Sequence, residues 1–179
     1  MILITGQPRG GLSFVWRLLT AAGYKLAFEP LNPWNRMPAD WAGHHEGAKQ
    51  PWSAYLGDGW QAFDKIIRVR RECMDTCFSQ WERDTVRQEP AVLVPKWQAL
   101  ERSMDEEIPT AYSLWYEELC AEPERVMGEV IAWLGGTGSI DGWGEVEPPK
   151  WMHRDYDTKT IHPARTGLWR KEPAFEAWW

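Results

Sequence analysis

The sequence predicts an α/β fold, a single domain with three layers in which helices cover both faces of a central parallel sheet. Three observations support this prediction. Short apolar segments alternate with segments whose apolar residues recur at helical spacing. A glycine-rich loop, 6–13, lies between the first such segment and the first helical one, as in phosphate-binding loops. The 179 residues are enough for one domain, 1–179, with a sizeable core.

Each element is predicted from its local pattern. Apolar runs bounded by turn residues predict strands at 2–5, 25–30 and 65–70 and at the start of 111–119. Apolar residues at helical spacing predict helices at 12–23, 72–88, 91–107 and 122–136. We expect 91–107 to be helical mainly after Pro95, and Gly23 and Gly135 to mark helix ends. Residues 31–60, rich in proline and glycine, are expected to form a long loop or lid with one short helix.

The composition limits the classes of partner. The chain has 26 acidic and 20 basic residues, a net charge of -6, which argues against a general nucleic-acid coat but permits a local basic pocket. Its three cysteines form no disulfide framework, and Cys73 and Cys77, four residues apart, are interpreted as reduced core thiols rather than metal ligands. No signal peptide and no membrane-spanning apolar run is found. We therefore expect a soluble, cytoplasmic protein with no nucleic-acid or membrane partner.

Polar residues follow several predicted strands. Ligands of parallel sheets bind at the carboxyl ends of the strands, so the loop 6–13, Glu29 and Arg70–Arg71 are expected to converge. The loop has Leu12 where a nucleotide-triphosphate loop has lysine, and no predicted strand ends in an aspartate for Mg²⁺. Arg9 supplies a fixed charge and Ser13 a hydroxyl. This pattern favours a smaller anion, bound without a metal.

A second anion site is expected where the third predicted strand ends. Arg71 would leave that strand, and Ser79 follows eight residues later on the predicted helix. Arginine recognises phosphate through several donors at once. Two separate anion sites suit a nucleotide with phosphates at both its 5′ and 3′ positions.

These motifs resemble those of sulfotransferases that use 3′-phosphoadenosine 5′-phosphosulfate (PAPS). Residues 8–13 resemble the loop of that family for the 5′-phosphosulfate, and Arg71, Asp75 and Ser79 resemble its 3′-phosphate motif. Residues 114–119, followed by the helix to Leu134 and Gly135, resemble a third family segment, and 167–170 a fourth. The run 28–31 resembles the end of the second strand in carbohydrate sulfotransferases.

The resemblance implies a P-loop-like sulfotransferase fold, PAPS as sulfuryl donor, PAP as product and no metal. It implies that 31–60 covers an acceptor and that the turn-rich segment 137–179 closes on the nucleotide. Tyr116 would pack against the adenine, and Arg165 would replace a family arginine. The residues implied to bind the nucleotide are Pro8, Arg9, Gly10, Gly11, Leu12, Ser13, Arg71, Ser79, Tyr116, Arg165, Gly167, Trp169 and Arg170.

The implied reaction is in-line transfer of the sulfuryl group to the hydroxyl of a carbohydrate or small molecule. Arg9 would neutralise the departing phosphate oxygen, and Glu29 would take the hydroxyl proton, with His44 and His45 as alternative bases. Gly10 and Leu12 depart from the family's serine and threonine. Two other hypotheses stay open: a non-catalytic PAP-binding or protein-interaction remnant of the fold, and a P-loop nucleotide kinase.

Overall fold

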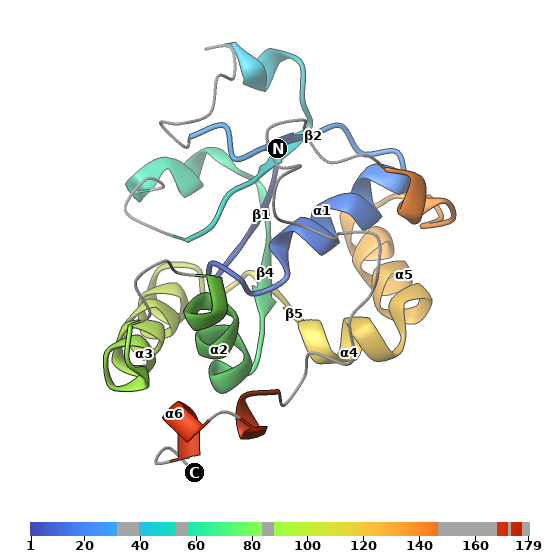
Figure 1. Ribbon diagram of the computed structural model, residues 1–179. Helices are drawn as coiled ribbons and strands as arrows, with labels where there is room; N and C mark the ends of the chain where they lie inside the picture. The colour runs from blue at the N-terminus through green and yellow to red at the C-terminus, as the bar shows by residue number, and fades with distance from the viewer. Residues whose placement is uncertain (32–39, 53–56, 84–87, 147–167, 172, 177–179) are drawn as a thin grey trace.

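The computed structural model describes residues 1–31, 40–52, 57–83, 88–146, 168–171 and 173–176 (Figure 1). These residues form a five-stranded sheet with the order β2-β3-β1-β4-β5, and every pair of neighbours is parallel. The strands are β1 (Ile2–Gly6), β2 (Leu26–Phe28), β3 (Gly47–Lys49), β4 (Lys65–Arg70) and β5 (Tyr112–Trp115). The predicted α/β architecture with a central parallel sheet is confirmed.

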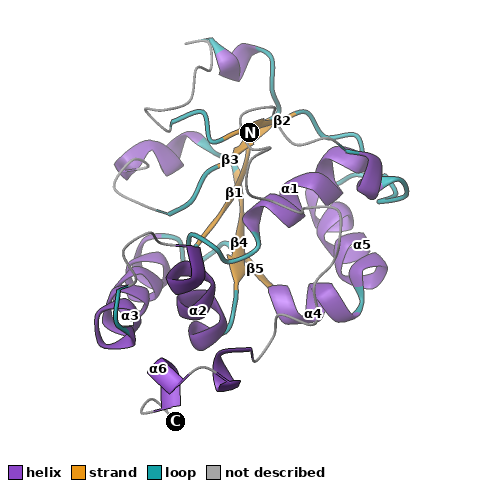
Figure 2. Ribbon diagram, in the orientation of Figure 1, coloured by secondary structure: helices purple, strands orange, loops and turns teal. Residues whose placement is uncertain are grey.

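The helices cover both faces of the sheet (Figure 2). The α-helices are α1 (Leu12–Ala21), α2 (Cys73–Arg83), α3 (Pro90–Glu107), α4 (Tyr116–Ala121), α5 (Pro123–Leu134) and α6 (Pro173–Glu176). Short 3₁₀ helices are η1 (Trp41–Gly43), η2 (Gly57–Ala62), η3 (Trp143–Glu145) and η6 (Leu168–Lys171). In Figure 1, α1, α4 and α5 lie to the right of the sheet, and α2 and α3 to its left. None of the described helices is long and apolar enough to cross a membrane.

Neighbouring residues of β1 pack into two different hydrophobic cores, because side chains alternate between the two faces of a strand. Ile4 belongs to the larger core, which includes Leu18 of α1 and Val130 of α5. Leu3 belongs to the second core, with Met104 of α3 among its members. Burial on both faces favours apolar residues on both faces of β1, and this explains why ILIT is recognisable as a strand.

The expectation that 31–60 holds only loop and one short helix is wrong, because β3 lies within it. This strand has the sequence Gly-Ala-Lys, which carries almost no apolar signal. Gly47 pairs with Ile2, and a Cβ at Gly47 would lie 2.1 Å from the carbonyl oxygen of Ile2. The strand is therefore specified by its fit between β1 and β2 rather than by its own residues.

Two other predicted boundaries change. The helix α3 begins at Pro90 and continues through Pro95, which removes only one hydrogen bond near the helix start. The segment 111–119 divides into β5 and α4 at Tyr116. The change from strand to helix at this point places Tyr116 at the carboxyl edge of the sheet.

A buried guanidinium joins β4 to α3. Arg68 donates to the carboxylates of Glu101 and Asp105, both at 2.6 Å, and its side chain is 4% exposed. Because Arg68 donates to it, Asp105 has a pKa below its usual value. The network fixes α3 on the sheet face next to the site described below.

Asp105→Asn is expected to lower stability near neutral pH by about 0.5 kcal/mol, because a half-exposed ion pair contributes little. The pKa of Asp105 is lower in the folded state, so its contribution is complete above the unfolded pKa and is lost as pH falls through the folded pKa. Urea unfolding at pH 7 and pH 3 checks this. A variant that loses as much stability at the acid pH as at neutral pH would contradict it.

Candidate functional site

The loop between β1 and α1 has a backbone suited to an anion. Three residues have positive φ: Gly6 at 151°, Arg9 at 69° and Gly11 at 94°. The N–H of Gly10 donates to the carbonyl of Gln7 at 3.0 Å, which closes a tight turn. Arg9 is a non-glycine residue in the left-handed region, a strained conformation that is common at functional sites.

Leu12 explains how the loop differs from one that binds nucleoside triphosphates. The residue is 4% exposed, and its side chain packs into the larger core. The N–H groups of Phe14 and Val15 donate to the carbonyl of Gly11. The preceding N–H groups, of Leu12 and Ser13, have no intrahelical acceptor by helix geometry, and they can hold an anion at the positive end of α1.

Arg71 and Tyr116 pack directly against this loop. Nη1 of Arg71 donates to the carbonyl oxygen of Arg9 at 2.9 Å, and its guanidinium lies 4.8 Å from the centre of the Tyr116 ring. The ring of Tyr116 lies so close to Gly11 that a Cβ there would be 2.1 Å from Cδ2. Burial, followed by the neighbouring Cys120, raises the pKa of Tyr116, so its phenol stays neutral.

The guanidinium of Arg71 retains capacity for a ligand. The residue is 7% exposed, and its Nε is buried without a hydrogen-bond partner among the described residues. A buried unpaired donor is costly, and an incoming phosphate would satisfy it. Ser79 and Asp75 are also buried, on α2 directly after Arg71. The structure thus brings the two predicted anion sites to the same edge of the sheet.

A group of aromatic rings beside the loop was not predicted as a group. Phe14, on the first turn of α1, lies 6.3 Å from Tyr116 and 5.3 Å from Trp143, measured between ring centres. All three are half-buried, so they offer apolar faces to a planar base. Trp143 lies far from the loop in sequence, and no local pattern marks it. Only the packing of η3 on α1 brings it here.

Glu29 lies at the carboxyl end of β2 and forms an ion pair with a residue that the sequence did not single out. Nζ of Lys49, at the end of β3, donates to Oε1 of Glu29. The Lys49 side chain is 5% exposed and lies 4.1 Å from the centre of the Phe28 ring. Glu29 has a φ of 48°, a second strained non-glycine residue at this edge. Lys49 was missed because β3 itself was missed.

The structure does not bring His44 and His45 to the loop. Both precede β3, whose first residue pairs with Ile2, so they lie at the amino edge of a parallel sheet. The loop between β1 and α1 lies at the carboxyl edge. The ring of His44 is 3.2 Å from the carboxylate of Asp40, and Nδ1 of His45 is 2.8 Å from the carbonyl oxygen of Trp41. The interpretation of these histidines as bases at the loop is therefore corrected: they lie on the wrong side of the sheet.

The predicted late motif is only partly within the described residues. Arg165 and Gly167 lie outside them. Trp169 and Arg170 belong to η6, which packs beside α2, and Arg170 is exposed. The side chain of Phe175, in α6, is fully buried against Phe78 and Trp81 of α2. The end of the chain therefore meets the helix that carries Ser79.

Solved structures share the fold of this chain. Mouse sulfotransferase SULT7A1 complexed with PAP aligns with a TM-score of 0.64 over 96% of this chain and 78% of its own, at 13% identity. The chain has the sulfotransferase fold. The sulfotransferase domain of the Synechococcus PCC 7002 olefin synthase aligns with a TM-score of 0.58 over 95% of this chain and 86% of its own, at 16% identity. No family model and no curated protein matches the sequence.

Gly11→Ala is expected to destabilise this sulfotransferase fold by about 2 kcal/mol, because the new Cβ clashes with Tyr116 in a strained backbone. Gly23→Ala is a matched control, since Gly23 has a φ of 97° and nothing within 4 Å of its Cβ position. Urea unfolding of both variants separates backbone strain from the clash. Equal losses in the two variants would show that the contact with Tyr116 contributes nothing.

Proposed function

We propose that the protein is a PAPS-dependent sulfotransferase that transfers the sulfuryl group to the hydroxyl of a carbohydrate or small molecule. One observation carries the proposal. Arg71, an arginine with a buried unpaired donor, contacts both the loop at Arg9 and the ring of Tyr116. The glycine-rich loop, this arginine and an aromatic ring thus meet at one edge of a sulfotransferase fold, which suits a nucleotide with 5′ and 3′ phosphates.

Each part of the sulfuryl donor PAPS has a group of residues that would bind it. The loop 6–13 and the start of α1 would hold the 5′-phosphosulfate, where Arg9 supplies charge and Ser13 a hydroxyl. Arg71 and Ser79 would hold the 3′-phosphate. Phe14, Tyr116 and Trp143 would contact the adenine. The buried position of Leu12 argues against a nucleoside triphosphate, whose outer phosphates rely on lysine at that position.

The chemistry requires one bond to form and one to break. The acceptor oxygen bonds to sulfur as the bridge from sulfur to the 5′-phosphate breaks, and PAP leaves. Glu29 takes the hydroxyl proton, and Lys49 holds that carboxylate in place and neutralises charge on the transferred oxygens. Sulfuryl transfer depends mainly on positioning and charge stabilisation. The buried ion pair and the strained Glu29 backbone fit a preorganised site.

Calorimetric titration with PAP, and separately with ATP and Mg²⁺, tests the proposal. We expect PAP to bind with micromolar affinity and ATP to give no heat. Incubation with radiolabelled PAPS and a panel of hydroxylated acceptors then tests transfer. Preferential binding of ATP would favour the nucleotide kinase. PAP binding without transfer to any acceptor would favour the non-catalytic remnant.

A further inference from the structure

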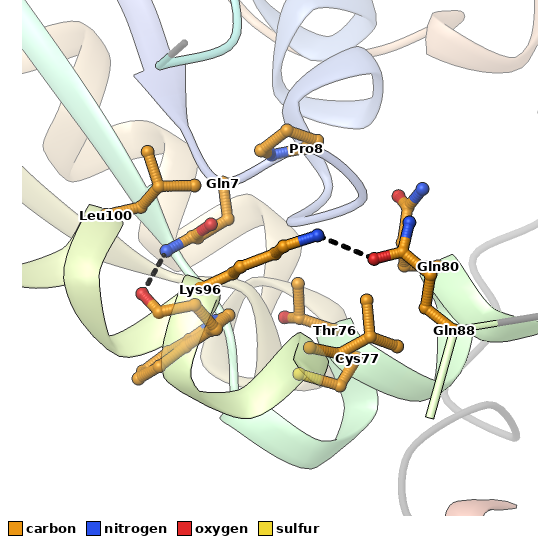
Figure 3. Close-up of a pocket in the computed structure, with 10 residues that line it drawn as sticks. Gln7, Pro8, Thr76, Cys77, Gln80, Gln88, Lys96 and Leu100 are labelled. Carbon is orange, nitrogen blue, oxygen red and sulfur yellow. Dashed lines mark hydrogen bonds between the residues drawn. The ribbon is translucent and has the colours of Figure 1, made fainter. Parts of the chain in front are cut away.

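A cavity of about 210 Å³ lies between the loop, α2 and α3 (Figure 3). Gln7 and Pro8 form its side toward the loop. The amide of Gln7 donates to the carbonyl of Trp97 at 2.8 Å and thereby ties the loop to α3. Because these two residues immediately precede Arg9, a molecule in the cavity would lie next to the loop that binds the anion.

The wall of the cavity combines apolar and neutral polar groups. Leu93, Trp97 and Leu100 provide apolar surface on α3, while Thr76 and Gln80 face it from α2. Amides and hydroxyls both donate and accept hydrogen bonds, so they suit a ligand that carries hydroxyl groups. The indole N–H of Trp97 is buried without a partner among the described residues. Such a mixture of apolar walls and a few polar groups is typical of small-molecule sites.

The described residues that line the cavity carry positive charge and no negative charge. Of the ten described residues that line it, only Lys96 is charged, and no carboxylate is among them. Nζ of Lys96 donates to the amide oxygen of Gln88 at 2.7 Å, which draws the ammonium across the cavity in Figure 3. An ammonium has three donors, and this contact uses one of them. The remaining donors can meet an anionic group on a ligand.

The volume limits the size of that ligand. A cavity of about 150 Å³ accommodates a benzene ring. The present cavity is somewhat larger, so it fits a single substituted ring of about ten to thirteen non-hydrogen atoms. A nucleotide or a polymer does not fit inside it as a whole.

We propose that this cavity binds the sulfuryl acceptor and that Lys96 selects acceptors in which one hydroxylated ring carries a carboxylate. The inference rests on the proposed function, because the neighbouring loop must present the sulfuryl group. The carboxylate accepts from Lys96, the ring packs on the α3 wall, and a ring hydroxyl points toward Pro8 and Arg9. Two classes of acceptor combine a hydroxylated ring with a carboxylate: phenolic acids and uronic acids. The experiment below tests each class separately.

Calorimetry with two matched pairs tests the inference: para-hydroxybenzoate against para-hydroxybenzamide, and glucuronate against glucose. In at least one pair the carboxylate is expected to bind about tenfold more tightly than its neutral partner, as for a charge-assisted hydrogen bond. The pair that shows the difference identifies the acceptor as aromatic or sugar. Lys96→Gln is expected to abolish the difference, and Lys96→Arg to retain most of it.

Lys25→Gln removes the same charge from an exposed residue at the amino edge of the sheet and is expected to change nothing. Equal affinity for both members of each pair, or discrimination that survives Lys96→Gln, would overturn the inference, as would the absence of binding at millimolar concentration. PAP titration separates the two proposals. PAP binding with no acceptor discrimination refutes only the role of the cavity, whereas discrimination without PAP binding refutes the proposed function.

Discussion

Arg71→Ala is expected to weaken PAP binding about 100-fold, because charge-assisted contacts from arginine to phosphate contribute about 1.5–3 kcal/mol and here also hold the loop. The same side chain donates to the carbonyl of Arg9 and covers the ring of Tyr116, so its removal loosens the proposed 5′ and adenine sites as well. Calorimetric titration with PAP measures the change.

Two variants test the origin of that loss. Arg71→Lys keeps the charge but loses the planar fork, and it is expected to recover only part of the affinity. Arg102→Ala removes an exposed arginine from α3, and PAP affinity is expected to stay unchanged. If Arg71→Ala bound PAP as tightly as the unmodified protein while remaining folded, the 3′-phosphate site would have to lie elsewhere.

Glu29→Gln is expected to lower kcat about 10²–10⁴-fold while PAP affinity stays the same, because general-base catalysis contributes about that factor. Glutamine keeps the shape of the side chain but cannot accept the hydroxyl proton. Rates with PAPS and the acceptor found in the panel measure the effect, and the KM for PAPS is expected to change little.

The ion pair with Lys49 requires its own controls, because Glu29→Gln leaves a buried ammonium without its carboxylate. Lys49→Met removes that ammonium, and its activity shows whether transfer depends on the charge. Urea unfolding of the same variant measures the accompanying change in stability. Glu124→Gln makes the same chemical change at an exposed position of α5 and is expected to be neutral. A Glu29→Gln variant with full kcat would exclude this carboxylate as the base.

Local sequence patterns were sufficient for the strongly apolar elements. The segment ILIT is buried on both faces as β1, and KIIRVR forms β4 within the predicted bounds. The glycines of the loop stand where a strand turns into a helix, as predicted, and two of them have positive φ. These features depend on the few residues around them, so they can be read from one sequence.

Features that depend on distant partners required the tertiary structure. The strand β3 is only Gly-Ala-Lys, and its place between β1 and β2 comes from backbone pairing. Finding that strand reveals Lys49 as the partner of Glu29 and places His44 and His45 at the opposite edge of the sheet. A parallel sheet gives every strand the same direction, so the edge on which a residue lies follows from the pairing rather than from its type.

The sequence by itself determined that this chain has an α/β fold with a glycine-rich loop after its first strand, because the apolar periodicity and the glycine positions are local properties. The tertiary structure alone decided which further side chains, beyond the expected Arg71 and Tyr116, lie at this edge of the sheet. Trp143 and Lys49 carry no local signal, and only the packing of η3 on α1 and the pairing of β3 with its neighbours bring them to this edge.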